Sequence, residues 1–274
     1  MVQSGSSDNL RFHLESTTKK ADTIVLHGVD ILVHRKGSGP QILVLHGGDG
    51  PIHRFPVSDQ LAECYEVIQP VHPGFAGTHI PEHFDNLQDL IFLYLDLIDH
   101  LDLREAILLG FSMGGWAATE IAVINTERFT KLVLVDSVGI KVGGPFDRDI
   151  ADVFAISPDE HTRISWHDSL KAPNPKLMTD EELQIFASDR IAHGLYTWEP
   201  YMHNPKLPYR LHRIDIPTLF IWGEDDEVVT PSYGEAFRKM IPGARMVIIP
   251  DSGHSPHVEQ PEVFVEHFSE FASH

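Results

Sequence analysis

A short motif between an apolar strand and a helix constrains this chain more than any other feature. Residues 110–115 read Gly-Phe-Ser-Met-Gly-Gly, a Gly-x-Ser-x-Gly pattern. At average usage of Gly and Ser, about 7% each, roughly one chain in ten of this length would contain the pattern by chance. Its context is therefore decisive: the apolar run EAILLGF precedes it directly, and a helical pattern follows from Met113.

A strand-to-helix turn this tight predicts an activated serine. The turn forces Ser112 into a strained backbone conformation, and glycine at the flanking positions avoids steric clashes. It also presents the Ser112 hydroxyl at a helix N-terminus, where the helix dipole favours developing negative charge. The alternative is a glycine-rich helix start with a capping serine. We interpret Ser112 as a nucleophile.

A serine hydroxyl needs a general base to become nucleophilic. The chain has 18 histidines, so position rather than presence must select the base. His254 follows the last apolar run, RMVII, and precedes the final helix, which places it beside the ends of the other strands. His257 is the rival, but it lies closer to the start of that helix. We predict that His254 is the base.

The third member should be an acid that holds the imidazole in the productive tautomer. An acidic run at residues 224–227 follows the penultimate apolar run, PTLFIWG. We favour Asp226 over Asp225 and interpret the flanking glutamates as a solvated turn. Asp136, at the end of KLVLVD, is a lesser candidate because it precedes an irregular segment.

Acyl transfer also requires two backbone N–H groups that stabilise the oxyanion, each worth on the order of 3–4 kcal/mol in the transition state. The residue after the nucleophile, Met113, should supply one. The glycine-rich loop at residues 46–50, which follows the apolar run QILVL, should supply the other, and we predict Gly48.

Short apolar runs alternate with helical patterns along most of the chain. The runs are apolar on both faces, as central strands of a parallel sheet require, and the pattern predicts an α/β fold with helices on both faces. We expect residues 1–139 and 214–274 to form this core.

Residues 140–213 break the rhythm and predict a helical insertion. Ser157 and Thr179 each stand at a helix start with Glu three residues later, which is the capping-box spacing. Insertions after a strand's carboxyl end lie over the ligand crevice of open α/β sheets. The predicted pocket residues are Phe111, Trp166, Phe186, Arg190 and Trp198. Arg190 could bind a substrate carboxylate, although basic helix residues more often face solvent.

Taken together, these features resemble the α/β-hydrolase superfamily, of the lidded single-domain type, over nearly the whole chain. The motifs that carry the resemblance, in the family's order, are His46-Gly47-Gly48, His72-Pro73-Gly74-Phe75, residues 110–115, Gly223 to Asp226 and Gly253-His254. In that family the acid usually stands three residues after the glycine of the Gly-x-x-Asp turn, which supports Asp226. His72 departs from the Asp that many members carry before Pro-Gly, and we expect it to alter a surface turn.

Within the family, two activities remain open. The Ser-Met-Gly-Gly elbow and residues 197–226 are similar to the carbon–carbon hydrolases that cleave vinylogous diketone acids. Those enzymes typically place Asn before the nucleophile and Trp after the catalytic His, whereas this chain has Phe111 and Ser255. We therefore expect hydrolysis of a small to medium, largely apolar carboxylic ester. Carbon–carbon cleavage is the alternative, and a non-catalytic receptor of the same fold is a third. Alkyl-halide and epoxide opening is excluded, because it uses a carboxylate nucleophile in this fold.

Composition limits partners and location. The chain has 40 Asp and Glu against 21 Lys and Arg, a balance that repels phosphate backbones and anionic membranes. We expect a small-molecule substrate and no nucleic acid or membrane partner, with a homodimer left open. Residues 1–10 show no signal-peptide pattern and no apolar run is long enough to span a membrane, so the expected location is cytoplasmic. We expect the single cysteine, Cys64, to be packed.

The reaction should need no cofactor and no metal. His79 and His83 have the i, i+4 spacing of some zinc sites, but Pro81 between them disfavours a helix that presents both on one face. The loop at residues 46–50 lacks the Lys-Ser/Thr ending of a phosphate-binding loop.

Overall fold

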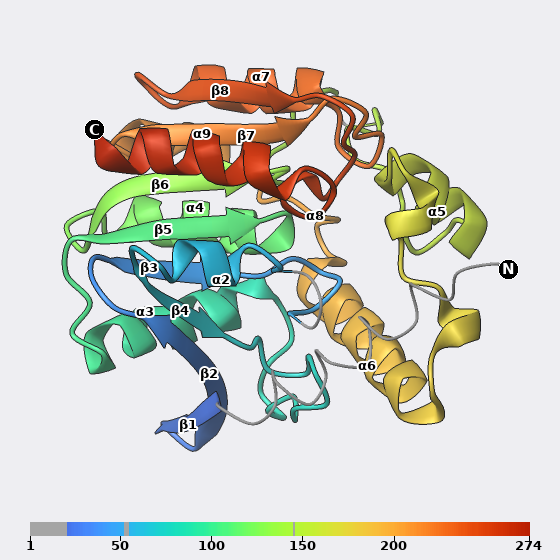
Figure 1. The fold of residues 1–274 in the computed structure, drawn as a ribbon, viewed down its shortest axis with the longest axis horizontal. Coiled ribbons are helices and arrows are strands. Elements are labelled where there is room, and N and C mark those ends of the chain that lie inside the picture. The colour runs from blue at the N-terminus through green and yellow to red at the C-terminus, as the bar shows by residue number, and fades with distance from the viewer. Residues whose placement is uncertain (1–20, 52–54, 145) are drawn as a thin grey trace, which may run out of the picture.

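The predicted α/β fold is confirmed in the computed structural model, which describes residues 21–51, 55–144 and 146–274. Its strands form one sheet in the order β1-β2-β4-β3-β5-β6-β7-β8 (Figure 1). The strands are β1 (Ala21–Leu26), β2 (Val29–Gly37), β3 (Gln41–Leu45), β4 (Glu66–Pro70), β5 (Ala106–Phe111), β6 (Phe129–Val135), β7 (Thr218–Gly223) and β8 (Arg245–Ile249). β2 pairs antiparallel with β1 and β4, and β3 to β8 pair in parallel.

Seven of these strands coincide with the apolar runs of the sequence, whereas β1 was not predicted. β1 lies at the edge of the sheet and pairs only with β2. Most of its side chains are at least partly exposed, and Val25 is 61% exposed. An edge strand of this kind leaves no continuous apolar run for sequence reasoning to find.

Two apolar clusters cover the two faces of the sheet. On one face lie α3 (Leu87–His100), α4 (Met113–Ile124) and α7 (Pro231–Met240); on the other lie α2 (Ser58–Leu61) and α9 (Pro261–Ser273), as Figure 1 shows. Alternate residues of β3 enter opposite clusters: Leu43 packs with the first and Ile42 and Val44 with the second. This two-sided burial is the reason the central strands are apolar throughout.

The helical insertion lies between β6 and β7, beyond the carboxyl ends of the parallel strands (Figure 1). It contains α5 (Pro158–Ser165), α6 (Asp180–Thr197) and four short 3-10 helices: η2 (Ser169–Lys171), η3 (Pro175–Leu177), η4 (Leu207–Tyr209) and η5 (Leu211–Arg213). Both predicted helix starts are present. The Ser157 hydroxyl accepts from the N–H of Glu160, and Thr179 forms a complete capping box with Glu182.

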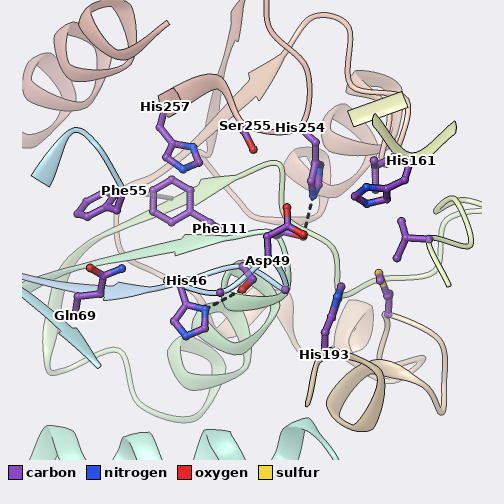
Figure 2. Close-up of a pocket in the computed structure, with 17 residues that line it drawn as sticks. His46, Asp49, Phe55, Gln69, Phe111, His161, His193, His254, Ser255 and His257 are labelled. Atoms are coloured by element: carbon purple, nitrogen blue, oxygen red, sulfur yellow. Dashed lines mark hydrogen bonds between the residues drawn. The ribbon is translucent and has the colours of Figure 1, made fainter. Parts of the chain in front are cut away.

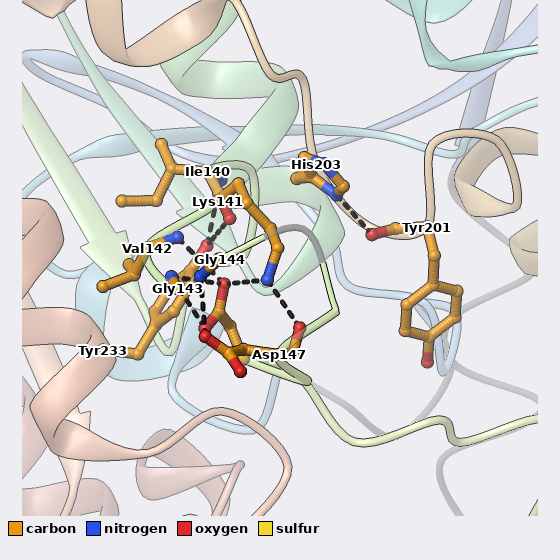
Figure 3. A network of polar contacts seen from close by, with 10 residues as sticks. Ile140, Lys141, Val142, Gly143, Gly144, Asp147, Tyr201, His203 and Tyr233 are labelled. Carbon is orange, nitrogen blue, oxygen red and sulfur yellow. Dashed lines mark hydrogen bonds and ion pairs between the residues drawn. The ribbon is translucent and has the colours of Figure 1, made fainter.

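A polar network fixes the first residues after β6 (Figure 3). Asp149 pairs with the Lys141 ammonium at 2.7 Å and accepts a hydrogen bond from the N–H of Gly143 at 3.0 Å. The Tyr233 hydroxyl of α7 donates to the carbonyl of Ile140 at 2.9 Å. These contacts tie the beginning of the insertion to the core.

The structure bears on the expectations for Cys64 and for membrane-spanning helices, but not on the one for residues 1–10. Cys64 is exposed, so the expectation of a packed thiol is wrong; α2 ends at Leu61, before it. None of the helices within the described ranges has the length and apolarity needed to cross a bilayer. Residues 1–10, which lack a signal-peptide pattern, fall outside the described residues.

Candidate active site

The turn between β5 and α4 has the strained geometry that its sequence predicts. Ser112 has φ 48° and ψ −114°, a conformation rare for a residue with a side chain, and its N–H donates to the carbonyl of Val135 at 2.9 Å. A Cβ on Gly110 would lie 2.5 Å from the Gly114 carbonyl oxygen, and a Cβ on Gly114 only 2.2 Å from that of Leu45. Both glycines are therefore required by close backbone approach.

Ser112, His254 and Asp226 form a continuous hydrogen-bonded chain. His254 Nε2 lies 2.9 Å from Ser112 Oγ, and Nδ1 lies 2.7 Å from Asp226 Oδ2. The N–H groups of Val228 and Val229 donate to Asp226 Oδ1 at 2.9 and 3.0 Å. An ionised carboxylate only accepts hydrogen bonds, so His254 Nδ1 carries the proton and Nε2 is left to accept from the serine hydroxyl. The arrangement suits proton transfer from Ser112 to His254.

The loop that carries His254 is held from two sides. The His254 N–H donates to the carbonyl of Ser165, at the end of α5, at 2.8 Å. Glu259 in α8 (Pro256–Glu259) is 2% exposed and accepts from the N–H of Gly253 at 2.7 Å and of Asp168 at 2.9 Å. Both the core and the insertion thus fix the position of the imidazole.

The glycine-rich loop after β3 passes directly beside the serine. A Cβ on Gly47 would lie 3.4 Å from the Cβ of Ser112, and a Cβ on Gly48 would lie 2.2 Å from the ring of His193. The loop is therefore enclosed between Ser112 and α6. Met113 is the first residue of α4, and its side chain is fully buried.

His72 does not lie in a surface turn, contrary to expectation. It is fully buried, and its N–H donates to His46 Nε2 at 3.0 Å. Its Nε2 donates to the carbonyl of His46 at 2.8 Å, and its Nδ1 accepts from the Tyr94 hydroxyl. The two imidazole rings lie 3.6 Å apart between centroids. His72 therefore supports the first residue of the glycine-rich loop from within the core.

Burial keeps this histidine pair neutral. It lowers the pKa of His72 to about 4 and, together with the neighbouring His72, holds the pKa of His46 well below its ordinary value. The hydrogen bonds agree, because the Nε2 of His46 and the Nδ1 of His72 each act as acceptors. A protonated ring would have no acceptor nitrogen left.

A small cavity of about 60 Å³ opens onto Ser112 (Figure 2). Phe55, Phe111 and His257 form an aromatic side, with the rings of Phe111 and His257 4.2 Å apart. His161 and His193, from the insertion, lie on the opposite side with His254. The remaining lining residues are His46, Gly47, Gly48, Asp49, Gly50, Gln69, Val153, Met202, Val228 and Ser255.

His193 is the pocket residue that sequence reasoning missed most clearly. Its ring packs on Gly48, and its buried Nε2 has no hydrogen-bond partner within the described chain. Burial lowers its pKa to about 4, so the ring is neutral at pH 7. Nothing in the spacing of 18 histidines distinguishes His193 or His161, since their approach to Ser112 depends on how the insertion docks.

Comparison with known proteins assigns the family. The model of the alpha/beta hydrolase family matches residues 42–267. The chain belongs to the α/β-hydrolase family.

A similar protein is an uncharacterized hydrolase of Bacillus subtilis, 27% identical over 77% of this chain and 81% of that protein. Another is a 2-hydroxy-6-oxononadienedioate/2-hydroxy-6-oxononatrienedioate hydrolase of Cupriavidus pinatubonensis, 28% identical over 96% of this chain and 90% of that protein. Among solved structures, a membrane phospholipase A described as a bacterial virulence factor has a TM-score of 0.78 at 21% identity. That match covers 97% of this chain and 92% of the other, and it shows the shared fold.

This α/β-hydrolase places only one of the five predicted pocket residues, Phe111, against the cavity at Ser112. Trp166 is buried behind the His254 loop, where its Cα lies 3.0 Å from the Cβ position of Gly253. Phe186 is half-buried and stands seven residues before His193 on α6, about 10 Å along the helix axis. These two predictions are corrected.

The other two predicted residues, Arg190 and Trp198, line a separate, open hollow beside α6. Arg190 donates to the carbonyl of Val153 at 2.6 Å and lies 5.2 Å from the ring centroid of Phe154. Trp198 is 61% exposed and lines the same hollow. The Arg190 guanidinium is thus committed to the insertion itself rather than directed at Ser112.

In the part of the chain that the structure describes, no cluster of three or more His, Cys, Asp or Glu side chains is arranged to hold a metal ion.

Proposed function

We propose that this α/β-hydrolase cleaves a small, largely apolar carboxylic ester through an acyl-enzyme on Ser112. The observation that carries the proposal is the hydrogen-bonded chain from Ser112 through His254 to Asp226. Nucleophile, acid and base follow one another in the chain order Ser, Asp, His, which is the order expected for this fold.

In the proposed reaction, Ser112 Oγ attacks the ester carbonyl while His254 Nε2 takes its proton. Asp226 stabilises the imidazolium that forms. The N–H groups of Met113 and Gly48 donate to the oxyanion of the tetrahedral intermediate. His254 then protonates the departing alcohol, and a water molecule repeats the sequence on the acyl-enzyme to release the acid.

The charge of the pocket favours an uncharged acyl group. Among its described lining residues there is no lysine or arginine, whereas Asp49 is acidic. Arg190, the residue that could have bound a substrate carboxylate, contacts Val153 and Phe154 instead. A small cavity of about 60 Å³ also favours a short acyl chain over a long one.

Carbon–carbon hydrolysis is the second candidate, because a relative named for such a substrate aligns with 96% of this chain. That name denotes a dicarboxylate, which an acidic pocket without a described cation would bind poorly. Phe111 and Ser255 also stand where those enzymes typically carry Asn and Trp.

We further propose that residues 140–213 act as a lid. Val153, His161, His193 and Met202 of this segment line the cavity, so a substrate would be enclosed between the insertion and the strand ends. Enclosure excludes water from the oxyanion and strengthens each hydrogen bond to it.

The test is hydrolysis of p-nitrophenyl acetate, butyrate and octanoate at pH 7.5. We expect wild type to prefer the short esters, and Ser112→Ala to lose about a thousandfold or more in kcat. Ser255→Ala, which changes the other serine of the pocket, is the matched control and should keep most of the activity. Full activity in Ser112→Ala would refute the proposal. If wild type is inactive on all three esters but bleaches a coloured dienolate, carbon–carbon cleavage replaces ester hydrolysis. Tight ligand binding without turnover would indicate a receptor.

A further inference from the structure

A second buried carboxyl group lies next to the acid of the proposed triad. Asp136 immediately follows β6 and is 1% exposed; Asp226 is 2% exposed. Both residues bond to Gly223, since Asp136 Oδ1 accepts from its N–H and the Asp226 N–H donates to its carbonyl, and the two carboxyl groups are close enough for Asp226 to act on Asp136 as a hydrogen-bonding neighbour. Two ionised carboxylates cannot share a hydrogen bond, because neither has a proton to donate. One carboxyl group of the pair must therefore be protonated for this contact to be favourable.

The surrounding donors identify which carboxyl group is ionised. Asp226 accepts hydrogen bonds from two backbone N–H groups, those of Val228 and Val229, and from His254 Nδ1. Asp136 receives only one, from the Gly223 N–H to Oδ1 at 2.9 Å. Its Oδ2 is buried, and no donor in the described part of the chain reaches it. The negative charge is therefore better stabilised on Asp226, and the proton belongs on Asp136 Oδ2.

The charges that face Asp136 act in the same direction. Burial and the adjacent Asp226 raise the pKa of Asp136 well above its ordinary value, and Glu259 of α8 adds to this effect. The opposing contribution comes from the Gly223 N–H of β7. Every ionisable side chain identified as acting on Asp136 is thus acidic, and each favours its neutral form.

The backbone at Asp136 holds this arrangement in place. Asp136 has φ 43°, a left-handed conformation that residues other than glycine seldom adopt, and its N–H donates to the carbonyl of Ile221 at 3.1 Å. The residue is thereby aimed across the end of β7 toward the turn that carries Asp226. A strained backbone at a buried acid is a feature that the fold must stabilise elsewhere.

We propose that Asp136 is protonated in the folded enzyme and donates a hydrogen bond from its carboxyl group to Asp226, which makes Asp136 a positioning residue for the triad. The donated bond orients the Asp226 carboxylate toward His254 and withdraws part of its negative charge. A less basic Asp226 stabilises the imidazolium less, so neutral His254 persists to lower pH. The kinetic part of this inference rests on the proposed function; the protonation of Asp136 does not.

Asp136→Asn separates the neutral from the ionised state. Asparagine retains an acceptor for Gly223 and a donor for Asp226, so it reproduces a protonated aspartic acid. We expect kcat within about twofold of wild type and an unchanged acid limb in the pH profile of kcat/KM. If Asp136 is ionised in wild type, the substitution removes a negative charge beside the triad. The acid limb then moves to lower pH, and the proposal is overturned.

A spectroscopic measurement tests the proton without using activity. The infrared difference spectrum of wild type minus Asp136→Asn, recorded on folded protein at pH 7, should contain the carbonyl stretch of a neutral carboxylic acid. Asp159→Asn, in the first turn of α5 at the surface, is the control and should give only the bands of an ionised carboxylate. A wild-type spectrum that shows Asp136 as a carboxylate refutes the proposal even if Ser112→Ala abolishes hydrolysis.

Asp136→Leu tests the positioning role, since it removes the donor but keeps a side chain that branches at Cγ. We expect the acid limb to move to higher pH by about one unit. The free energy of a hydrogen bond to a charged group, about 1.5 kcal/mol, corresponds to a change of about one pKa unit. A limb that stays at the wild-type position would show that the bond does not influence His254. If this variant does not fold, Asp136→Asn and the infrared band still decide the question.

Discussion

The neutral histidine pair beneath the glycine-rich loop makes stability at low pH a test of the structure. His72 has a pKa of about 4 in the folded protein, whereas an unfolded chain gives histidine a pKa of about 6.5. Below pH 6.5 the unfolded state binds more protons, so the free energy of unfolding falls as pH falls from 6.5 toward 4. Between pH 7.0 and 4.5, His72 alone should cost about 2 kcal/mol of stability.

The assay is urea unfolding of wild type and His72→Asn at both pH values. Asparagine can donate to the His46 carbonyl and accept from Tyr94 but cannot take up a proton, so its own cost at pH 7.0 is subtracted. We expect the loss between pH 7.0 and 4.5 to be smaller in His72→Asn by about 2 kcal/mol. His79→Asn, an exposed histidine, should behave as wild type. Equal losses in wild type and His72→Asn would refute the burial and neutrality of His72.

Further predictions concern the catalytic loop and the residues that hold it. Gly48→Ala places a methyl group 2.2 Å from the His193 ring, so kcat/KM should fall at least tenfold in steady-state assays, and adding His193→Ala should restore part of it. Asp226→Asn should keep the fold but lower kcat by about 10⁴, because asparagine stabilises the wrong tautomer of the base; a smaller loss than tenfold would contradict the assigned acid. Glu259→Ala leaves the buried N–H of Gly253 and the part-buried N–H of Asp168 without an acceptor and should destabilise the protein by about 2–4 kcal/mol in urea unfolding, with Glu259→Gln in between. Esterase kcat/KM should rise roughly thirtyfold from pH 5 to 7.5 as His254 loses its proton, and a flat profile would rule out an imidazole base.

The core of the fold could be predicted from the sequence because a strand buried on both faces requires a run of apolar residues. The central parallel strands β5 and β7 are buried along their whole length, and the carboxyl ends of parallel strands meet at one edge of the sheet. Ser112, Asp226 and His254 each follow one of these runs directly, so their convergence could be expected before any contact was known. The capping residues Ser157 and Thr179 likewise predicted the starts of α5 and α6, since an N-cap depends only on neighbouring residues.

The elements that were missed are those whose signals are not local. Most side chains of the edge strand β1 are at least partly exposed, so this strand has no continuous apolar run. His72 looks like a turn residue in sequence but is fully buried against His46. The pocket residues on the insertion depend on the rotation of α6, which places His193 rather than Arg190 against Gly48. Such packing is a tertiary property that a pattern of residue types does not encode.

The bond between the His254 N–H and the Ser165 carbonyl limits how this insertion can be exchanged between relatives. Lid segments are attractive units for chimaeras, because substrate preference can be transplanted with them. In this chain, however, the end of α5 positions the loop that carries His254, and the N–H of Glu227 donates to the neighbouring Ile164 carbonyl at 3.1 Å. A graft that replaced all of residues 140–213 would remove both attachments together with the old specificity. Recombination from residue 169 onward would spare them, so donor segments should be joined after Asp168 rather than at the end of β6.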